Sequence, residues 1–206
     1  NGTTLLHLIC TKKPTVSTKW TIQIANKLIE KGADTNIPDK DNKIPLHYAV
    51  VINGKDWCDH DKDESVYPEK FVNLINLLLE NGSDPNFKDK QGITPFHSLY
   101  IENLQMKNKS DGRQGNTTSI TESIYNFKFV YLAAMDLIKY GGDINEQIPE
   151  DYPITGAIEG RYEFAGKSVI DILERVKNSR HFNSVHPGFG INNVVENMRK
   201  KSNDLE

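Results

Sequence analysis

The sequence predicts an all-α protein built from repeated helix pairs that glycine-containing turns join. A helix ending of the form Gly-x-Asp-x-Asn occurs three times, at residues 32–36, 82–86 and 141–145. Each ending is followed by a polar turn and a new apolar segment. Gly32 to His47 and Gly82 to His97 both span 15 residues, and such regular spacing indicates internal repeats.

The stretch 77–97 shows why the unit folds in this way. Leucines 77–79 close an apolar helix face, and Gly82 supplies the left-handed conformation that follows a helix end. The polar run 88–92 favours a tight turn. Thr94 can then cap a new helix whose first position, Pro95, needs no amide hydrogen.

The first repeat is expected to contain a helix over residues 1–10 and a second helix from Ser17 or Thr18 to Lys31. In the first of these helices we expect four buried residues, Leu5, Leu6, Leu8 and Ile9. In the second helix, helical periodicity places four apolar residues on one face, Trp20, Ile24, Leu28 and Ile29.

The second and third repeats carry insertions between their two helices. The second repeat starts near Asn42, has an insertion at 53–67 and continues in a helix from Pro68. The third starts at Gly92 and has a polar insertion at 103–120. A capping box formed by Ser119 and Glu122 opens its second helix, which runs to Tyr140. We expect no insertion in the turns.

The fourth repeat is the most divergent. We expect it to start near Tyr152 and Pro153 and to have its second helix at about 168–177. An irregular segment, 178–190, then leads to a last amphipathic helix at 191–200. The last apolar face of a stack of repeats needs cover, so we interpret this helix as a cap, with the start of a further repeat as the alternative.

The helix starts resemble the ankyrin repeat, in which this position reads Thr-Pro-Leu-His-x-Ala. Three segments carry the resemblance: Thr94-Pro95-Phe96-His97, Pro45-Leu46-His47-Tyr48-Ala49, and Leu6-His7 after Thr4. It implies an all-α ankyrin-repeat solenoid of about four helix-turn-helix repeats with a C-terminal capping helix. The expected boundaries are 1–38, 39–88, 89–147 and 148–177, followed by the segment 178–206.

The same resemblance implies a binding surface. Ankyrin repeats usually bind protein partners through their turn tips and the exposed face of the first helix of each repeat. The matching positions here are Lys40, Asp41, Lys43, Val51, Ile52, Lys90, Gln91, Ile93, Ile101 and Glu102. If Val51, Ile52, Ile93 and Ile101 are exposed, they form an apolar centre with a polar rim; the alternative is that the isoleucines pack under the insertions.

Composition limits the other classes of function. The formal net charge is −3 with a pI of about 6.1, which does not favour binding to nucleic acid or to membranes. No apolar run reaches the length of a membrane-spanning helix. Two cysteines, Cys10 and Cys58, do not form a disulfide framework, so we expect a reducing compartment. The chain starts within a repeat and without methionine, which suggests part of a longer protein.

Two groups of residues invite a chemical interpretation. His7, His47 and His97 occur one per repeat, and the resemblance implies structural hydrogen bonds for them rather than a shared metal. The segment 57–64 holds Cys58, His60 and several carboxylates, but it lacks the glycine and the final glutamate of an EF-hand loop. We interpret it as a solvated acidic insertion, with a contact for a basic partner as the alternative.

The predicted function is therefore recognition of another protein through the concave surface, by a cytoplasmic monomer that uses no metal or cofactor. The alternative is an enzyme whose site lies in the insertions or outside this sequence. Divergent repeats with long insertions also resemble ankyrin proteins of intracellular bacteria and large DNA viruses, which often act on host proteins. By that analogy the chain would be a host-directed effector or scaffold in the host cytoplasm.

Overall fold

The fold is known from a computed structural model that describes residues 2–11, 18–51, 67–105, 120–152, 165–177 and 191–204. Within these ranges the regular elements are helices: α1 (Leu5–Cys10), α2 (Thr18–Glu30), α3 (Pro45–Ala49), α4 (Tyr67–Glu80), α5 (Pro95–Gln105), α6 (Ile120–Lys139), α7 (Val169–Lys177) and α9 (Ile191–Asn203). One isolated antiparallel bridge joins Gln147 and Ser168. The predicted all-α class is confirmed.

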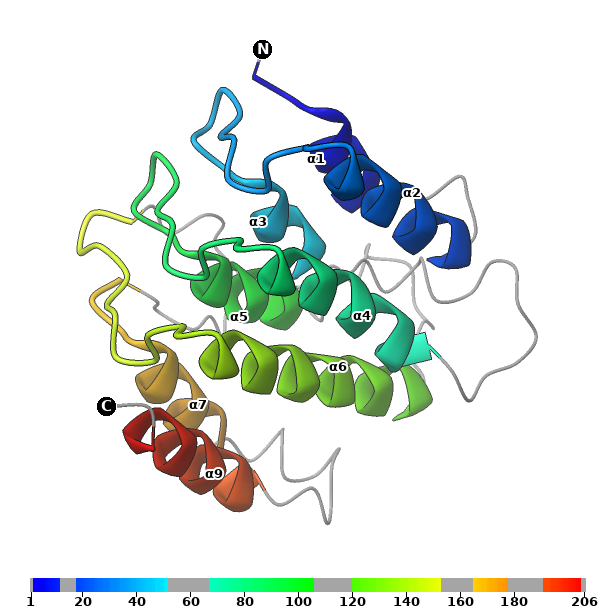
Figure 1. Cartoon of the computed structure of the whole chain (residues 1–206). Helices are drawn as coiled ribbons and strands as arrows, with labels where there is room; N and C mark the ends of the chain where they lie inside the picture. Colours follow the sequence, from blue (N-terminus) through cyan, green and yellow to red (C-terminus); the bar gives the residue numbers. More distant parts are fainter. Residues whose placement is uncertain are drawn as a thin grey trace, which may run out of the picture.

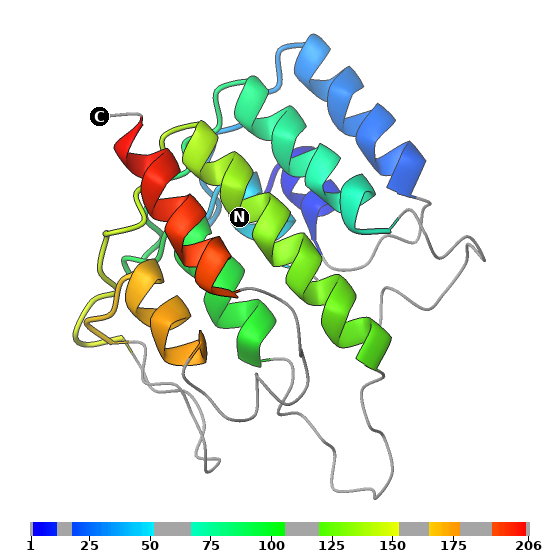
Figure 2. The ribbon, with the colours of Figure 1, turned by 90° about the horizontal axis from the view of Figure 1, so that it is seen from below.

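The helices form two layers, which Figures 1 and 2 show from two directions. One layer holds α1, α3, α5 and α7, and each of these helices contacts the next. The other layer holds α2, α4, α6 and α9, again in contact in that order. Each helix of the first layer also packs against a partner in the second, which gives the helix pairs α1–α2, α3–α4, α5–α6 and α7–α9.

Capping residues fix where the helices of the first layer begin. Thr94 accepts the His97 amide hydrogen at an N···O distance of 3.2 Å, and Thr4 is the N-cap of α1 in the same way. Ser168 and Asp171 make an equivalent pair at α7, where the Asp171 carboxylate accepts the Ser168 amide at 2.9 Å. These local bonds satisfy amide groups that a helix start leaves unpaired.

A glycine fixes where α2, α4 and α6 of the second layer end. Gly82 follows α4 with φ of +81°, and its amide donates to the Leu79 carbonyl at 3.0 Å. The Ser83 amide donates to the Leu78 carbonyl at 3.0 Å, so that the last carbonyls of the helix are satisfied before the chain turns away.

The core lies between the two layers and continues through all four pairs. Its largest fully buried apolar side chains include Leu6, Leu46, Leu78, Phe96, Tyr100, Phe129 and Leu137, and Met198 of α9 closes it. The expectations for the first pair were partly wrong. Leu6 is buried and Ile9, Leu28 and Ile29 are partly buried, but Leu5, Leu8, Trp20 and Ile24 are exposed.

The fourth pair differs from the prediction. α7 contacts α5 and therefore lies in the layer of first helices, whereas we expected residues 168–177 to form a second helix. α9 contacts both α6 and α7, so it is the second helix of this pair and not an added cap. The reason is the capping pair Ser168–Asp171, which starts α7 where Thr94 and His97 start α5.

The expectation that no insertion falls in a turn is consequently wrong. The connection from α6 to α7 leaves at residue 152 and returns at 165. The Ile148 amide donates to the Lys167 carbonyl at 3.0 Å, and the Gly166 amide donates to the Ile148 carbonyl at 2.9 Å. These bonds close the turn around the insertion 153–164.

Some expectations lie outside the described residues. These are residues 53–66 of the expected insertion 53–67 with the segment 57–64, the part of the third insertion from 106 to 119, the Ser119–Glu122 capping box, Ile52, the expected repeat start at Pro153, and the expected irregular segment 178–190. α5 extends to Gln105 and so includes the first residues of the predicted insertion 103–120. None of the described helices combines the length and apolarity that a membrane crossing requires.

Candidate functional site

Three turns project side by side at one end of the helix pairs (Figure 1). We refer to residues 31–44 as the first turn, 81–94 as the second turn and 140–152 as the third turn. The first and second turns have the same internal hydrogen bonds. The Asp39 carboxylate accepts the amides of Asp41 and Lys43 at 2.9 and 3.0 Å. The Asp89 carboxylate accepts the amides of Gln91 and Ile93 at 2.8 and 3.0 Å.

These bonds make each turn tip a closed loop whose end points into solvent. Lys40 and Asp41 stand at the end of the first turn, and Lys90 and Gln91 stand at the end of the second. All four of these predicted binding residues are exposed. The turn chemistry therefore places two pairs of polar side chains at matching positions.

The tips of the first and second turns are also bonded to each other. The Lys90 amide donates to the Asp41 carbonyl at 3.1 Å, and the Asn42 side chain donates to the Lys88 carbonyl at 2.7 Å. Lys43 adds an ion pair with Asp89, whose carboxylate is almost fully buried, at 3.5 Å. Because one backbone bond and two side-chain contacts join them, the two tips form one continuous surface.

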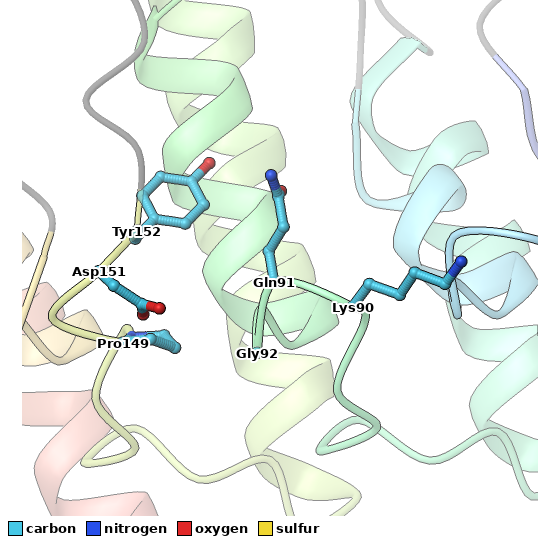
Figure 3. A pocket seen from close by; sticks show the side chains of 6 residues that line it. All are labelled: Lys90, Gln91, Gly92, Pro149, Asp151 and Tyr152. Carbon is cyan, nitrogen blue, oxygen red and sulfur yellow. The ribbon is translucent and has the colours of Figure 1, made fainter.

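A pocket of about 390 Å³ lies between the second and third turns. It is lined by Lys90, Gln91, Gly92, Pro149, Asp151 and Tyr152 (Figure 3). The side chains of Gln91 and Tyr152 stand on opposite sides of the space and point in a similar direction. Lys90 extends away from it, on the side opposite Tyr152. The pocket thus offers an aromatic ring, a proline, an amide and a carboxylate.

Both acidic and basic side chains surround the pocket and the turn tips. Tyr152 is half-buried, and burial raises the pKa of its phenol, with the nearby carboxylates Glu102 and Asp89 adding to the rise. The phenol is therefore a neutral hydrogen-bonding group at physiological pH. Glu102, the remaining predicted binding residue on α5, is partly buried, as is Lys43 in its ion pair with Asp89.

A second tyrosine, Tyr48, stabilises the first turn through a hydrogen bond. The Tyr48 hydroxyl of α3 donates to the Asp39 carboxylate at 2.6 Å. Burial raises the pKa of Tyr48, and the Asp39 charge adds to this effect. Burial alone would raise the pKa of Asp39, but hydrogen bonds from Tyr48 and from the Lys43 and Asp41 amides outweigh it and hold that pKa below its ordinary value.

Of the two alternatives for the predicted apolar residues, an exposed apolar centre is wrong for the three that the structure describes. Val51, Ile93 and Ile101 are each at most 9% exposed and belong to the core cluster, and Ile52 lies outside the described residues. Ile93 joins the second turn to α3, because its carbonyl is 3.0 Å from the His47 Nε2 atom and its amide donates to Asp89 of the same turn. At the end of α5, the Asn103 side chain donates to the Val50 carbonyl at 2.9 Å, which packs this helix against α3.

The structural interpretation of the three histidines is confirmed. The Nδ1 atoms of His7, His47 and His97 accept the amides of Thr4, Ile44 and Thr94 at 3.1, 3.2 and 3.3 Å. Each Nε2 atom lies 2.8–3.0 Å from a backbone carbonyl of the following turn. Both ring nitrogens of each histidine are therefore engaged by the protein itself.

Among the residues that the structure describes, groups suited to covalent or metal chemistry do not gather at the turn tips and the pocket. Burial raises the pKa of the Cys10 thiol to about 12, so it remains a thiol at neutral pH. Within the described ranges, no three His, Cys, Asp or Glu side chains come close enough to hold a metal ion. Cys58 and His60 lie outside those ranges.

Three pocket residues, Pro149, Asp151 and Tyr152, are not among the binding residues predicted from the sequence. We had placed Tyr152 at the start of the fourth repeat, because the pair Tyr152-Pro153 resembles a helix start. The available signal was the spacing: Gly141 to Thr155 is 14 residues, one short of the unit seen twice before. A scan against protein-family models found no match to this chain, and a search of curated proteins found none either.

Proposed function

We propose that this chain is an ankyrin-repeat solenoid that binds a partner protein through its turn tips and the pocket beside them. The repeated Thr-Pro-Leu-His-like helix starts, the glycine helix ends and the histidine bonds between successive turns support the ankyrin proposal. A stack of this kind offers an extended and rigid surface rather than an enclosed cavity, which suits a protein partner.

One observation carries the binding proposal. The exposed tips Lys40–Asp41 and Lys90–Gln91 are joined by the 3.1 Å backbone bond from Lys90 to Asp41, and the second of them, Lys90–Gln91, lines the pocket together with Tyr152. Polar groups that are already ordered lose little conformational entropy when a partner binds. A tyrosine beside a polar rim is a common anchor in protein interfaces.

The anchor in this proposal differs from the one expected from the sequence. Since Ile93 and Ile101 are part of the core, Tyr152 and Pro149 provide the apolar contact, and a side chain of the partner enters the pocket between the second and third turns. We also propose that the protein is a cytoplasmic monomer that needs no metal or cofactor.

The test is affinity capture from a cell lysate with quantitative mass spectrometry, comparing the wild-type chain with Lys40→Glu/Lys90→Glu. The matched control is Lys27→Glu/Lys200→Glu, which makes the same charge change on exposed residues of α2 and α9. We expect a protein that the wild type and the control retain and the tip variant loses. Equal retention by all three chains would reject the turn tips as the binding surface.

A further inference from the structure

The contact between successive helix pairs is directional, because a histidine of each pair donates a hydrogen bond to a backbone carbonyl in the turn that leads into the next pair. The Nε2 atoms of His7, His47 and His97 lie 2.8, 3.0 and 2.8 Å from the carbonyls of Lys43, Ile93 and Glu146. Since Nδ1 of each ring accepts an amide hydrogen, Nε2 carries the proton and donates it to the carbonyl. In every case the earlier pair is the donor and the later pair is the acceptor.

An asparagine makes a second connector with the same direction. The Asn36 side chain donates to the Gly82 carbonyl at 2.7 Å and accepts the Asp84 amide at 2.9 Å. Asn86 repeats this with Gly141 and Asp143, both at 2.8 Å. A helix pair therefore has a giving face with a histidine and an asparagine, and a receiving face with backbone acceptors and an amide.

One further position on the first-layer helix belongs to the receiving face. The residue after the repeat histidine points to the preceding pair: the Tyr48 ring lies 5.9 Å from the His7 ring, nearly edge-on. Ser98 holds the same position in α5 and is 4% exposed. Leu8 holds it in α1, where it is 57% exposed.

The second-layer helix shows the same pattern when positions are counted back from its closing glycine. Eight residues before that glycine, Leu74 and Ala133 are 6% and 0% exposed, but Ile24 is 43% exposed. Twelve residues before it, Phe129 is 1% exposed, but Trp20 is 57% exposed. Positions that are buried in the later pairs are therefore exposed on α1 and α2.

We propose that the outer face of α1 and α2, formed by Leu5, Leu8, Trp20 and Ile24, is a receiving face for a further helix pair of the same construction. A histidine of the occupant donates a hydrogen bond to the Thr3 carbonyl. Thr3 is the equivalent of Ile93, because Thr3 lies four residues before His7 and Ile93 lies four residues before His97. Its asparagine binds the Gly32 carbonyl and the Asp34 amide, the positions that Gly82 and Asp84 hold in the next pair. Together with Ile37, the outer face holds the large apolar side chains that the described part of the chain exposes.

A second copy of this chain does not fit as the occupant. The opposite end is formed by α7 and α9, where Asp171 stands at the position of the repeat histidine and cannot donate to a carbonyl when ionised. Around Met198, α9 exposes Glu196, Asn197, Arg199 and Lys200. Two outer faces placed against each other would offer acceptors to acceptors. This inference concerns a different surface from the turn tips and does not depend on the proposed function.

The test adds a helix pair to the intact chain. A copy of residues 43–92 is joined ahead of Thr3, so that Gly92 of the copy takes the place of Gly2; both glycines have left-handed φ, +73° and +66°. Trp57 is replaced by Phe in every copy, which leaves Trp20 as the single tryptophan. The control fusion carries His47→Ala/Asn86→Ala in the added pair alone, which removes both connectors.

Trp20 fluorescence reports whether the outer face is covered. We expect its emission to shift to shorter wavelength and its quenching by acrylamide to fall several-fold in the fusion, with a smaller effect in the control fusion. Unchanged emission and quenching in a fusion that circular dichroism shows to be folded would overturn the proposal. So would concentration-dependent protection of Trp20 with dimer formation in the unfused chain, because a second copy would then be the occupant.

A substitution cycle gives an independent reading. Ile24→Asp should leave the urea midpoint of the unfused chain nearly unchanged, because the side chain is exposed there. In the fusion the same substitution should lower the midpoint clearly, because it buries a carboxylate. An equal loss in both proteins would show that Ile24 belongs to the core of the chain itself, and the proposal would fail.

Discussion

The Nε2 atom of His47 lies 3.0 Å from the backbone carbonyl oxygen of Ile93, which is in the following turn of the chain. The Nδ1 atom of the same ring accepts the Ile44 amide hydrogen at 3.2 Å. The ring is thus neutral, with its proton on Nε2, and it ties the start of α3 to the second turn. Both the stability of the fold and the spacing of the turn tips therefore depend on this hydrogen bond.

Replacing His47 with alanine should destabilise the fold by about 1–3 kcal/mol, because the Ile44 amide and the Ile93 carbonyl both lose a partner in a buried place. Urea denaturation followed by circular dichroism measures the change. His47→Gln serves as a comparison, since it retains a donor and an acceptor. A midpoint equal to that of the wild type in the alanine variant would show that the bond contributes nothing.

Stability should fall as the pH decreases below neutrality. Burial lowers the pKa of both His47 and His97 below the ordinary value. Near pH 6.5 these histidines bind protons in the unfolded chain but not in the folded chain. Each histidine therefore lowers the free energy of unfolding by at most about 1.4 kcal/mol for each pH unit below that value. The contribution is complete above that pH and is lost as the pH falls toward the lowered folded pKa.

The check compares urea midpoints at about pH 7.5 and about pH 5.5, the range in which histidine titrates. His47→Gln/His97→Gln should show a flatter dependence than the wild type, because the two titrating groups are gone. If the variant and the wild type lose the same stability between the two conditions, the histidines are not the cause.

Gly92→Ala should be more destabilising than Gly32→Ala. Both glycines have left-handed φ, +73° and +88°, so an alanine at either costs about 1–2 kcal/mol in backbone strain. At Gly92 a Cβ atom would also lie 2.5 Å from Pro149 Cγ, whereas at Gly32 it would meet open space. Thermal unfolding of the two variants measures the difference, and equal losses would mean that the second and third turns do not touch as described.

Ile93→Ala should cost about 2–5 kcal/mol of stability, because it leaves a cavity in the core. Lys90→Ala, three residues earlier on an exposed tip, should change stability by less than about 0.5 kcal/mol. Chemical denaturation of both variants separates the core from the surface. An Ile93→Ala chain as stable as the wild type would return Ile93 to the exposed surface that the sequence suggested.

The sequence predicted those features that local chemistry decides. Thr94 and Pro95 start a helix, Gly82 ends one, and Asp89 closes a turn with its own neighbours, so the helix starts and the polar tips could be placed from spacing alone. Lys90 and Gln91 were found in this way.

Burial depends on neighbours that sequence spacing does not supply. Ile93 looks exposed by its position in a turn, but its carbonyl is bound by His47 of the preceding pair. Leu8 looks buried because it is apolar, but the described chain places no helix against it. The pocket residue Tyr152 was misplaced because an insertion falls inside the turn before α7, where Ser168 replaces the expected threonine.

The most direct test of the binding surface is hydrogen exchange with mass spectrometry on the chain in complex with its captured partner. We predict slower amide exchange in residues 39–43, 88–92 and 147–152, the turn tips and the edge of the pocket. The backbone amides of α4 and α6 should exchange at the same rate as in the free chain. Protection confined to those helices, with the three turns unchanged, would contradict the account.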